Sequence, residues 1–271
     1  MTTQGKGTAL ITGASSGIGA VYADRLARRG YDLIIVARGR AKLDALATRL
    51  TNETKRSVEV LAADLNDTSD LSRVEETLKS DASITFLVNN AGFGAFAPLL
   101  DSDINKMEEM ISVNVNALTR LTYAAVPGFV ARGTGTIVNI SSIVAISPET
   151  LNGVYGGSKA YVLAFSHSLQ HELASKGIRV QAVLPGATAT NFWETGGLPV
   201  HNLPSAIVMT TENLVDAALS GLDQGELITI PSLPDKGEWD RYEAARRDMS
   251  SRLSRTIPAA RYGVKALAKV S

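Results

Sequence analysis

The chain has 271 residues, of which 45% are hydrophobic and 20% charged, a balance typical of a globular protein with a sizeable core. Its 27 basic residues equal its 27 acidic ones, so no overall positive field favours nucleic acid or an anionic membrane as a partner. Cysteine is absent, which excludes disulfides, thiolate metal sites and a cysteine nucleophile. The start of the chain has no apolar signal core, and no run of about 18 apolar residues occurs, so we expect a soluble cytoplasmic protein.

Short apolar runs alternate with longer amphipathic segments along the chain. The apolar runs predict strands over residues 8–12, 32–37, 58–63, 84–90, 135–141, 178–185 and 226–230. The amphipathic segments predict helices over about 17–29, 39–51, 68–80, 101–130, 153–176 and 211–222. Most of the strands are apolar throughout, as strands buried on both faces are. We therefore predict an α/β fold, a doubly wound Rossmann-type, mostly parallel seven-stranded sheet with helices on both faces.

No repeat, low-complexity tract or linker divides the sequence, and we interpret residues 1–271 as a single domain. Residues 187–210 combine glycine and proline with Phe192 and Trp193, which predicts a mobile flap over the substrate. Residues 232–271 predict a charged helix and tail, which we interpret as a C-terminal helical appendage.

A glycine-rich turn, "TGASSGIG", follows the first predicted strand. Gly13, Gly17 and Gly19 permit a tight turn and close approach of the backbone to a phosphate. The helix that begins there offers free amides to a pyrophosphate. A glycine turn without a ligand is the alternative, but its place after the first strand of an alternating chain favours a dinucleotide site.

Five motifs occur in the order and spacing of one enzyme family. They are "TGASSGIG" (12–19), "NNAG" (89–92), "ISS" (140–142), "YGGSK" (155–159) and "PGATAT" (185–190). Together they resemble the short-chain dehydrogenase/reductase family, in its compact single-domain type, over about residues 6–230. The resemblance implies an oxidoreductase that uses NAD(P)(H) and acts on an alcohol or carbonyl.

The end of the second strand indicates which dinucleotide is used. The family commonly has an acidic residue there to hold a ribose hydroxyl, whereas this chain has Ala37 followed by Arg38. An arginine can pair with a 2′-phosphate, so we expect NADP(H), with a further hydroxyl contact from Ser15. Asp64 resembles the residue that binds adenine, with a turn or N-cap role as the alternative. The full set of expected cofactor residues is Gly13, Ser15, Gly17, Ile18, Gly19, Arg38, Asp64, Asn90, Ala91, Gly92, Tyr155, Lys159, Pro185, Gly186, Thr188 and Thr190.

Tyr155 is the only one of the seven tyrosines with a lysine four residues on, so Tyr155 and Lys159 share one helix face. Carbonyl reduction needs a proton donor, and we expect Lys159 to lower the pKa of the Tyr155 phenol for that role. The resemblance adds Ser142 to orient the substrate oxygen and Asn114 to hold a water that relays protons to Lys159. Two glycines between Tyr155 and Lys159 depart from the usual motif, and their purpose stays open.

Apolar residues after these motifs, Phe93, Ile143, Phe192 and Trp193, predict a pocket for a medium-sized hydrophobic ketone or aldehyde. By resemblance, helices 101–130 and 153–176 pack against a second copy in a homodimer or homotetramer. His167 and His171 lie one turn apart, but without a third ligand in a matching motif we expect no metal. The alternatives are a non-catalytic NADP(H)-binding sensor or scaffold, and an epimerase or dehydratase, whose glycine spacing and longer C-terminal region are not found here.

Overall fold

The computed structural model describes residues 6–264 and divides into two compact units, Met1–Ser232 and Leu233–Ser271. The strands are β1 (Thr8–Thr12), β2 (Asp32–Ala37), β3 (Val58–Ala62), β4 (Ile84–Asn89), β5 (Gly135–Ile140), β6 (Ile178–Val183) and β7 (Ile228–Thr229). The α-helices of the first unit are α1 (Gly17–Arg28), α2 (Arg40–Thr54), α3 (Thr68–Ser80), α4 (Ile104–Ile111), α5 (Leu118–Arg132), α6 (Gly153–Leu173), α7 (Phe192–Thr195) and α8 (Thr211–Asp223).

The strands form one sheet in the order β3-β2-β1-β4-β5-β6-β7, and every neighbouring pair is parallel. The predicted doubly wound fold is confirmed. The chain order reverses between β1 and β4, so the crossovers on either side of this point run in opposite directions. A crevice therefore opens at the carboxyl ends of these two strands, where ligands bind in sheets of this type.

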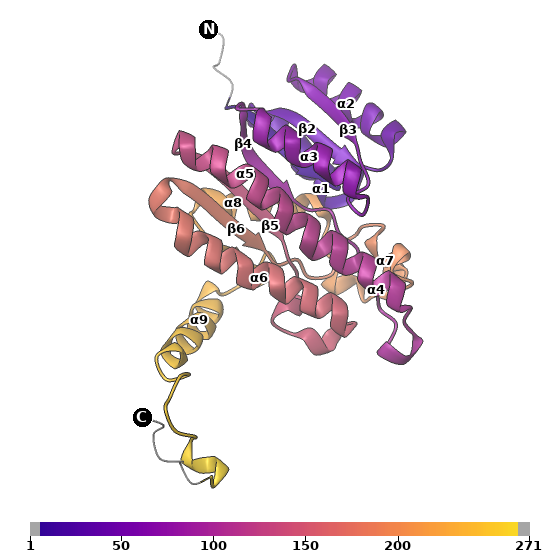
Figure 1. Ribbon diagram of the computed structural model, residues 1–271. Helices are drawn as coiled ribbons and strands as arrows, with labels where there is room; N and C mark the ends of the chain where they lie inside the picture. The colour runs from indigo at the N-terminus through magenta and orange to yellow at the C-terminus, as the bar shows by residue number, and fades with distance from the viewer. Residues whose placement is uncertain (1–5, 265–271) are drawn as a thin grey trace. The chain divides into compact units, whose positions relative to one another are not determined.

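Successive side chains of the central strands point to opposite faces of the sheet, so they pack in two separate hydrophobic cores. Ile11 and Ile35 pack with α1, α2 and α8 on one face. Leu10 and Ile34 pack with α3, α5 and α6 on the other, the face that Figure 1 turns towards the viewer. Both faces of the sheet are thus covered, which explains why most of its strands are largely apolar.

The predicted helix 101–130 begins later and is interrupted. Asp103 caps α4 by accepting a hydrogen bond from the Asn105 amide, so the helix begins at Ile104. A π-helical turn, Ser112–Ala117, separates α4 from α5. Such turns are rare and occur mostly as local insertions at functional sites.

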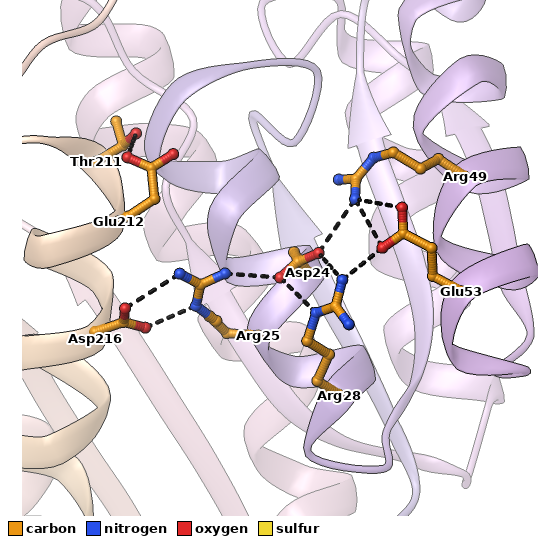
Figure 2. A network of polar contacts seen from close by, with 8 residues as sticks. All are labelled: Asp24, Arg25, Arg28, Arg49, Glu53, Thr211, Glu212 and Asp216. Carbon is orange, nitrogen blue, oxygen red and sulfur yellow. Dashed lines mark hydrogen bonds and ion pairs between the residues drawn. The ribbon is translucent and has the colours of Figure 1, made fainter.

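An ionic network ties α1 to α2 and α8 (Figure 2). Asp24 of α1 is nearly buried and bonds to Arg25 and Arg28 of its own helix and to Arg49 of α2. Arg25 also pairs with Asp216 of α8 at 2.7 Å. Burial alone would raise the pKa of Asp24, but the hydrogen bonds from the three arginines outweigh it and hold that pKa below its ordinary value. The network therefore stabilises the packing of these helices.

The second unit contains α9 (Lys236–Ser250). Asp235 caps its first turn through the Gly237 amide, and the rings of Trp239 and Tyr242 lie 5.2 Å apart. Among residues 6–264 no helix has the length and apolar character needed to cross a membrane.

Candidate active site

The backbone of the glycine turn between β1 and α1 is so closely packed that it leaves no room for side chains at Gly13 and Gly19. Gly13 has φ +67°, and a side chain at Gly19 would lie 2.4 Å from the Gly13 carbonyl oxygen. Both positions therefore require glycine. Ser16, at the start of α1, makes no side-chain cap, which leaves the first amides of the helix available to a phosphate. Ile18 of the same turn packs on the core.

The loop after β4 braces this turn. The Asn90 side chain donates to the Thr12 and Gly13 carbonyls at 2.9 and 3.3 Å. The Thr12 hydroxyl accepts bonds from the amides of Asn90 and Ala91, each at 3.0 Å. The predicted Asn90 and Ala91 positions thus lie beside the glycine turn, where they fix its shape.

The ends of β2 and β3 carry the remaining candidates for the adenosine side. Arg38 follows β2 directly, is exposed, and has no carboxylate partner within residues 6–264. Ser15 is half-buried in the glycine turn. Asp64 accepts a hydrogen bond from the Asn66 amide and donates its own amide to Asp70, so it acts as a turn residue. The structure therefore shows the hydrogen bonds expected if Asp64 is a turn residue.

Tyr155 and Lys159 lie in the first two turns of α6. Asn152 caps this helix through the amides of Val154 and Tyr155, and its side-chain nitrogen donates to the Ala97 carbonyl at 2.8 Å. The cap fixes the start of the helix and thereby the position of Tyr155. The Lys159 ammonium lies 5.8 Å from the Tyr155 ring centroid and donates to the Ile140 carbonyl at 3.0 Å, so it reaches the carboxyl end of β5.

Ser142 stands just beyond β5, facing the same space. Its hydroxyl donates to the Pro185 carbonyl at 3.4 Å, and it lies near enough to the Tyr155 phenol to lower the pKa of that group. The neighbouring Ser141 hydroxyl is instead turned to the Lys159 carbonyl at 2.8 Å. Of the two serines, Ser142 alone therefore adjoins the phenol of Tyr155.

Asn114 lies in the π-helical turn and is 1% exposed. Its side chain accepts a bond from the Phe93 amide and donates to the Phe93 carbonyl and to Ser158. A side chain at Gly92 would lie 2.7 Å from the Asn114 oxygen and 3.6 Å from the Lys159 nitrogen. Gly92 thus brings the β4 loop, the π turn and Lys159 together.

Burial determines the ionisation of the pair. It raises the pKa of Tyr155 to about 12, against a smaller lowering by the hydrogen bond with Ser142. Burial also lowers the pKa of Lys159 to about 8. The Tyr155 pKa is therefore raised and not lowered as expected, because removal of the phenol from water is the largest influence on it. Tyr155 is accordingly a protonated phenol at neutral pH.

The segment after β6 runs beside the glycine turn. The Thr188 hydroxyl donates to the Gly186 carbonyl at 3.0 Å, and the Thr190 methyl would be 3.1 Å from a side chain at Gly17. The Pro185 carbonyl also accepts a bond from the amide of Ile143 at 3.0 Å. These contacts place the predicted clamp residues next to both the glycine turn and Ser142.

The flap forms an aromatic cluster over the site. The Phe192 ring lies 5.5 Å from that of Tyr155, and the Trp193 ring stacks on Phe96 at 5.1 Å. Phe93 packs in the same cluster. Of the four residues predicted for the pocket, Phe93 and Phe192 pack with Tyr155, Trp193 contacts Phe96 and Phe192, and Ile143 directly follows Ser142.

Two methionines that were not predicted from the sequence pack with the same apolar residues around Tyr155. Met107 and Met110 of α4 are buried against Tyr155 and Val144. Their spacing places them on one face of α4, which was visible in the sequence but does not distinguish a pocket from ordinary core. Within residues 6–264 no group of three or more potential metal ligands gathers.

A family model for short chain dehydrogenases matches residues 7–197. The chain belongs to the short-chain dehydrogenase family. It is therefore an oxidoreductase with a nucleotide cofactor, and the glycine turn with its uncapped helix fits such a group.

Solved structures of similar proteins extend over nearly the whole of this short-chain dehydrogenase. A short-chain dehydrogenase from Sphingobium yanoikuyae in complex with NADPH is 48% identical, with a TM-score of 0.92 over 94% of this chain and 99% of that one. A bulky-bulky ketone specific alcohol dehydrogenase from Comamonas testosteroni is 44% identical, with a TM-score of 0.88 over 96% of this chain and 99% of that one.

Curated relatives are more distant. A very-long-chain 3-oxoacyl-CoA reductase from Anas platyrhynchos is 35% identical over 78% of this chain and 67% of its own length. A hydroxysteroid dehydrogenase-like protein 1 from Gallus gallus is 35% identical over 68% of this chain, which spans only 56% of that relative.

Proposed function

We propose that this short-chain dehydrogenase is an NADP(H)-dependent reductase of medium-sized hydrophobic ketones or aldehydes, with Tyr155 as the general acid. The observation that carries the proposal is the gathering of the buried Tyr155, Ser142 and Lys159 side chains at the carboxyl end of β5, where burial raises the pKa of the Tyr155 phenol. A carbonyl oxygen that accepts hydrogen bonds from both hydroxyls is held beside its proton donor.

The cofactor, when bound, supplies a hydride to the carbonyl carbon. The Ser142 hydroxyl orients the substrate oxygen and shares the negative charge that develops on it. Tyr155 passes its proton to that oxygen, so the carbonyl becomes an alcohol. Lys159 lies one turn away, and its ammonium stabilises the tyrosinate left behind. The Asn114 side chain is committed to Phe93 and Ser158, so its role is to fix the π turn beside Lys159.

NADP(H) is favoured over NAD(H) by the residues after β2. Ala37 leaves out the carboxylate that would repel a 2′-phosphate, and Arg38 is exposed with no acidic partner in the described chain. The likeness to a structure solved with NADPH supports the same choice.

The substrate class follows from the wall of the site. Phe93, Phe192, Met107, Met110 and Val144 surround Tyr155 with apolar side chains. Methionine side chains adapt to groups of different shape, which suits a ketone with large substituents. The likeness to a bulky-bulky ketone specific enzyme agrees with this assignment.

The proposal is tested by following NADPH and NADH oxidation with a panel of aryl and alkyl ketones and aldehydes. We expect turnover of hydrophobic ketones, with a higher kcat/KM when NADPH is the reductant. Tight NADPH binding without turnover of any carbonyl would favour the sensor or scaffold alternative, and equal use of both cofactors would contradict the role of Arg38. Assembly into a homodimer or homotetramer through residues 101–130 and 153–176 stays a prediction.

A further inference from the structure

Phe192 packs in a well-defined position beside Tyr155. Its ring lies 5.5 Å from the Tyr155 ring and packs on the apolar cluster that contains Met107 and Met110. Figure 1 shows the short helix α7, which carries Phe192, next to α4, which carries the methionines. The ring therefore lies beside the phenol that a ketone oxygen has to approach.

Gly94 leaves the room that the Phe192 ring occupies. It is buried, and a side chain there would lie 2.4 Å from the Cζ atom at the tip of the Phe192 ring. Such a distance is far inside van der Waals contact, so even a methyl group requires the ring to move. Gly94 and Phe192 are distant in sequence, and the fold alone brings them together.

Neighbouring rings hold Phe192 from the other side. The ring centroids of Phe96 and Phe192 lie 5.8 Å apart in an edge-to-face arrangement, and Phe96 in turn stacks on Trp193. A side chain at Gly196 would lie 2.1 Å from Phe96, so this contact also depends on a glycine. Trp193 is anchored by a 2.8 Å hydrogen bond from its indole to the Thr188 carbonyl. The position of the Phe192 ring is thus determined on several sides.

We propose that Phe192 is the residue that sets the size of the ketone substituent admitted beside Tyr155. We also propose that Gly94, by having no side chain, allows the Phe192 ring to lie there. This inference rests on the proposed function. A pocket discriminates by about 10- to 200-fold between substrates that differ by one methylene, so a displaced phenyl ring changes substrate choice strongly.

The test compares acetophenone with isobutyrophenone, which differ only in a methyl versus an isopropyl substituent. The readout is the ratio of kcat/KM for isobutyrophenone to that for acetophenone, with NADPH saturating. We expect Phe192→Ala to raise the ratio at least about tenfold. Gly94→Ala forces the ring out of its present position, so we expect it to change the ratio by a similar factor in the native background. In the Phe192→Ala background it has little effect, because there is no ring to displace.

Gly153→Ala is the matched control, since a side chain there meets nothing within 4 Å and the ratio stays at its native value. Urea unfolding of the native protein, the Gly94→Ala and Phe192→Ala variants and the double variant gives a readout that does not depend on activity. Gly94→Ala should lower the free energy of unfolding only when Phe192 is present. A ratio insensitive to Phe192→Ala, or an effect of Gly94→Ala that is equal in both backgrounds, refutes this inference alone. Failure of the unaltered enzyme to reduce any ketone refutes the proposed function and this inference with it.

Discussion

The cost of burying Lys159 predicts how the stability of the protein depends on pH. The side chain is 6% exposed, and burial lowers its pKa from 10.5 to about 8. A shift of about 2.5 units corresponds to about 3 kcal/mol of differential interaction between the two protonation states. Below pH 8 the folded protein bears this cost in full, because both folded and unfolded chains are protonated there.

Between pH 8 and 10.5 the unfolded chain binds the lysine proton while the folded chain has lost it, so the free energy of unfolding rises with pH. Lys159→Met removes the amine and with it this rise. We expect the unfolding free energy of the native protein, minus that of Lys159→Met, to increase by roughly 2–3 kcal/mol from pH 7 to pH 10. Tyr155 is present in both proteins, so its own titration largely cancels in the difference.

The assay is urea unfolding followed by circular dichroism at pH 7, 8, 9 and 10. Lys176→Met is the control, since this lysine is exposed just beyond α6 and stays in water on folding. The native-minus-control difference should be flat with pH. A flat difference for Lys159→Met as well would refute the reasoning, because it would mean that the ammonium is not desolvated in the folded protein.

Five further substitutions test other parts of the structure. Arg38→Ala should raise the Kd for NADPH at least about tenfold and leave that for NADH nearly unchanged, since only NADPH carries the 2′-phosphate; equal losses in a fluorescence titration would contradict this. Gly157→Ala should stabilise the protein by about 0.5–1 kcal/mol in urea unfolding, because the position is exposed on α6 with nothing near an added methyl. Gly156→Ala should stabilise it less, because the added methyl would lie 3.2 Å from a proline side chain; an equal gain at both positions would argue against this packing. Asp24→Asn should cost about 1–3 kcal/mol because it removes the buried carboxylate that Arg25, Arg28 and Arg49 share, whereas Asp223→Asn, in an exposed pair, should cost less than about 1 kcal/mol; similar losses would show that burial of Asp24 is unimportant.

The fold was predictable from sequence because most strands are buried, largely apolar runs; the edge strand β3 is the exception, with Glu59 exposed. The predicted helix 68–80 coincides with α3, and strand 8–12 with β1. Strand 226–230 is shorter, since only Ile228 and Thr229 pair with β6. The π turn at 112–117 was missed, because nothing in its local composition distinguishes it from the α-helix on either side.

The candidate site shows the same limit. The motifs identify residues by their order along the chain, but they do not show the contact between Gly94 and Phe192, which depends on tertiary packing. The sign of the Tyr155 pKa shift was likewise missed. Sequence indicates that Lys159 is one turn away, whereas the shift depends on how completely the phenol is removed from water.

The most direct test of the account is the Tyr155→Phe substitution, which removes one oxygen atom and keeps the ring that packs on Phe192. Ketone reduction and NADPH affinity are measured on the same preparation. The account predicts a fall in kcat of at least about 10²-fold, as expected for loss of a general acid, with the Kd for NADPH nearly unchanged. Turnover at the native rate, with NADPH bound as before, would contradict the assignment of Tyr155 as the proton donor.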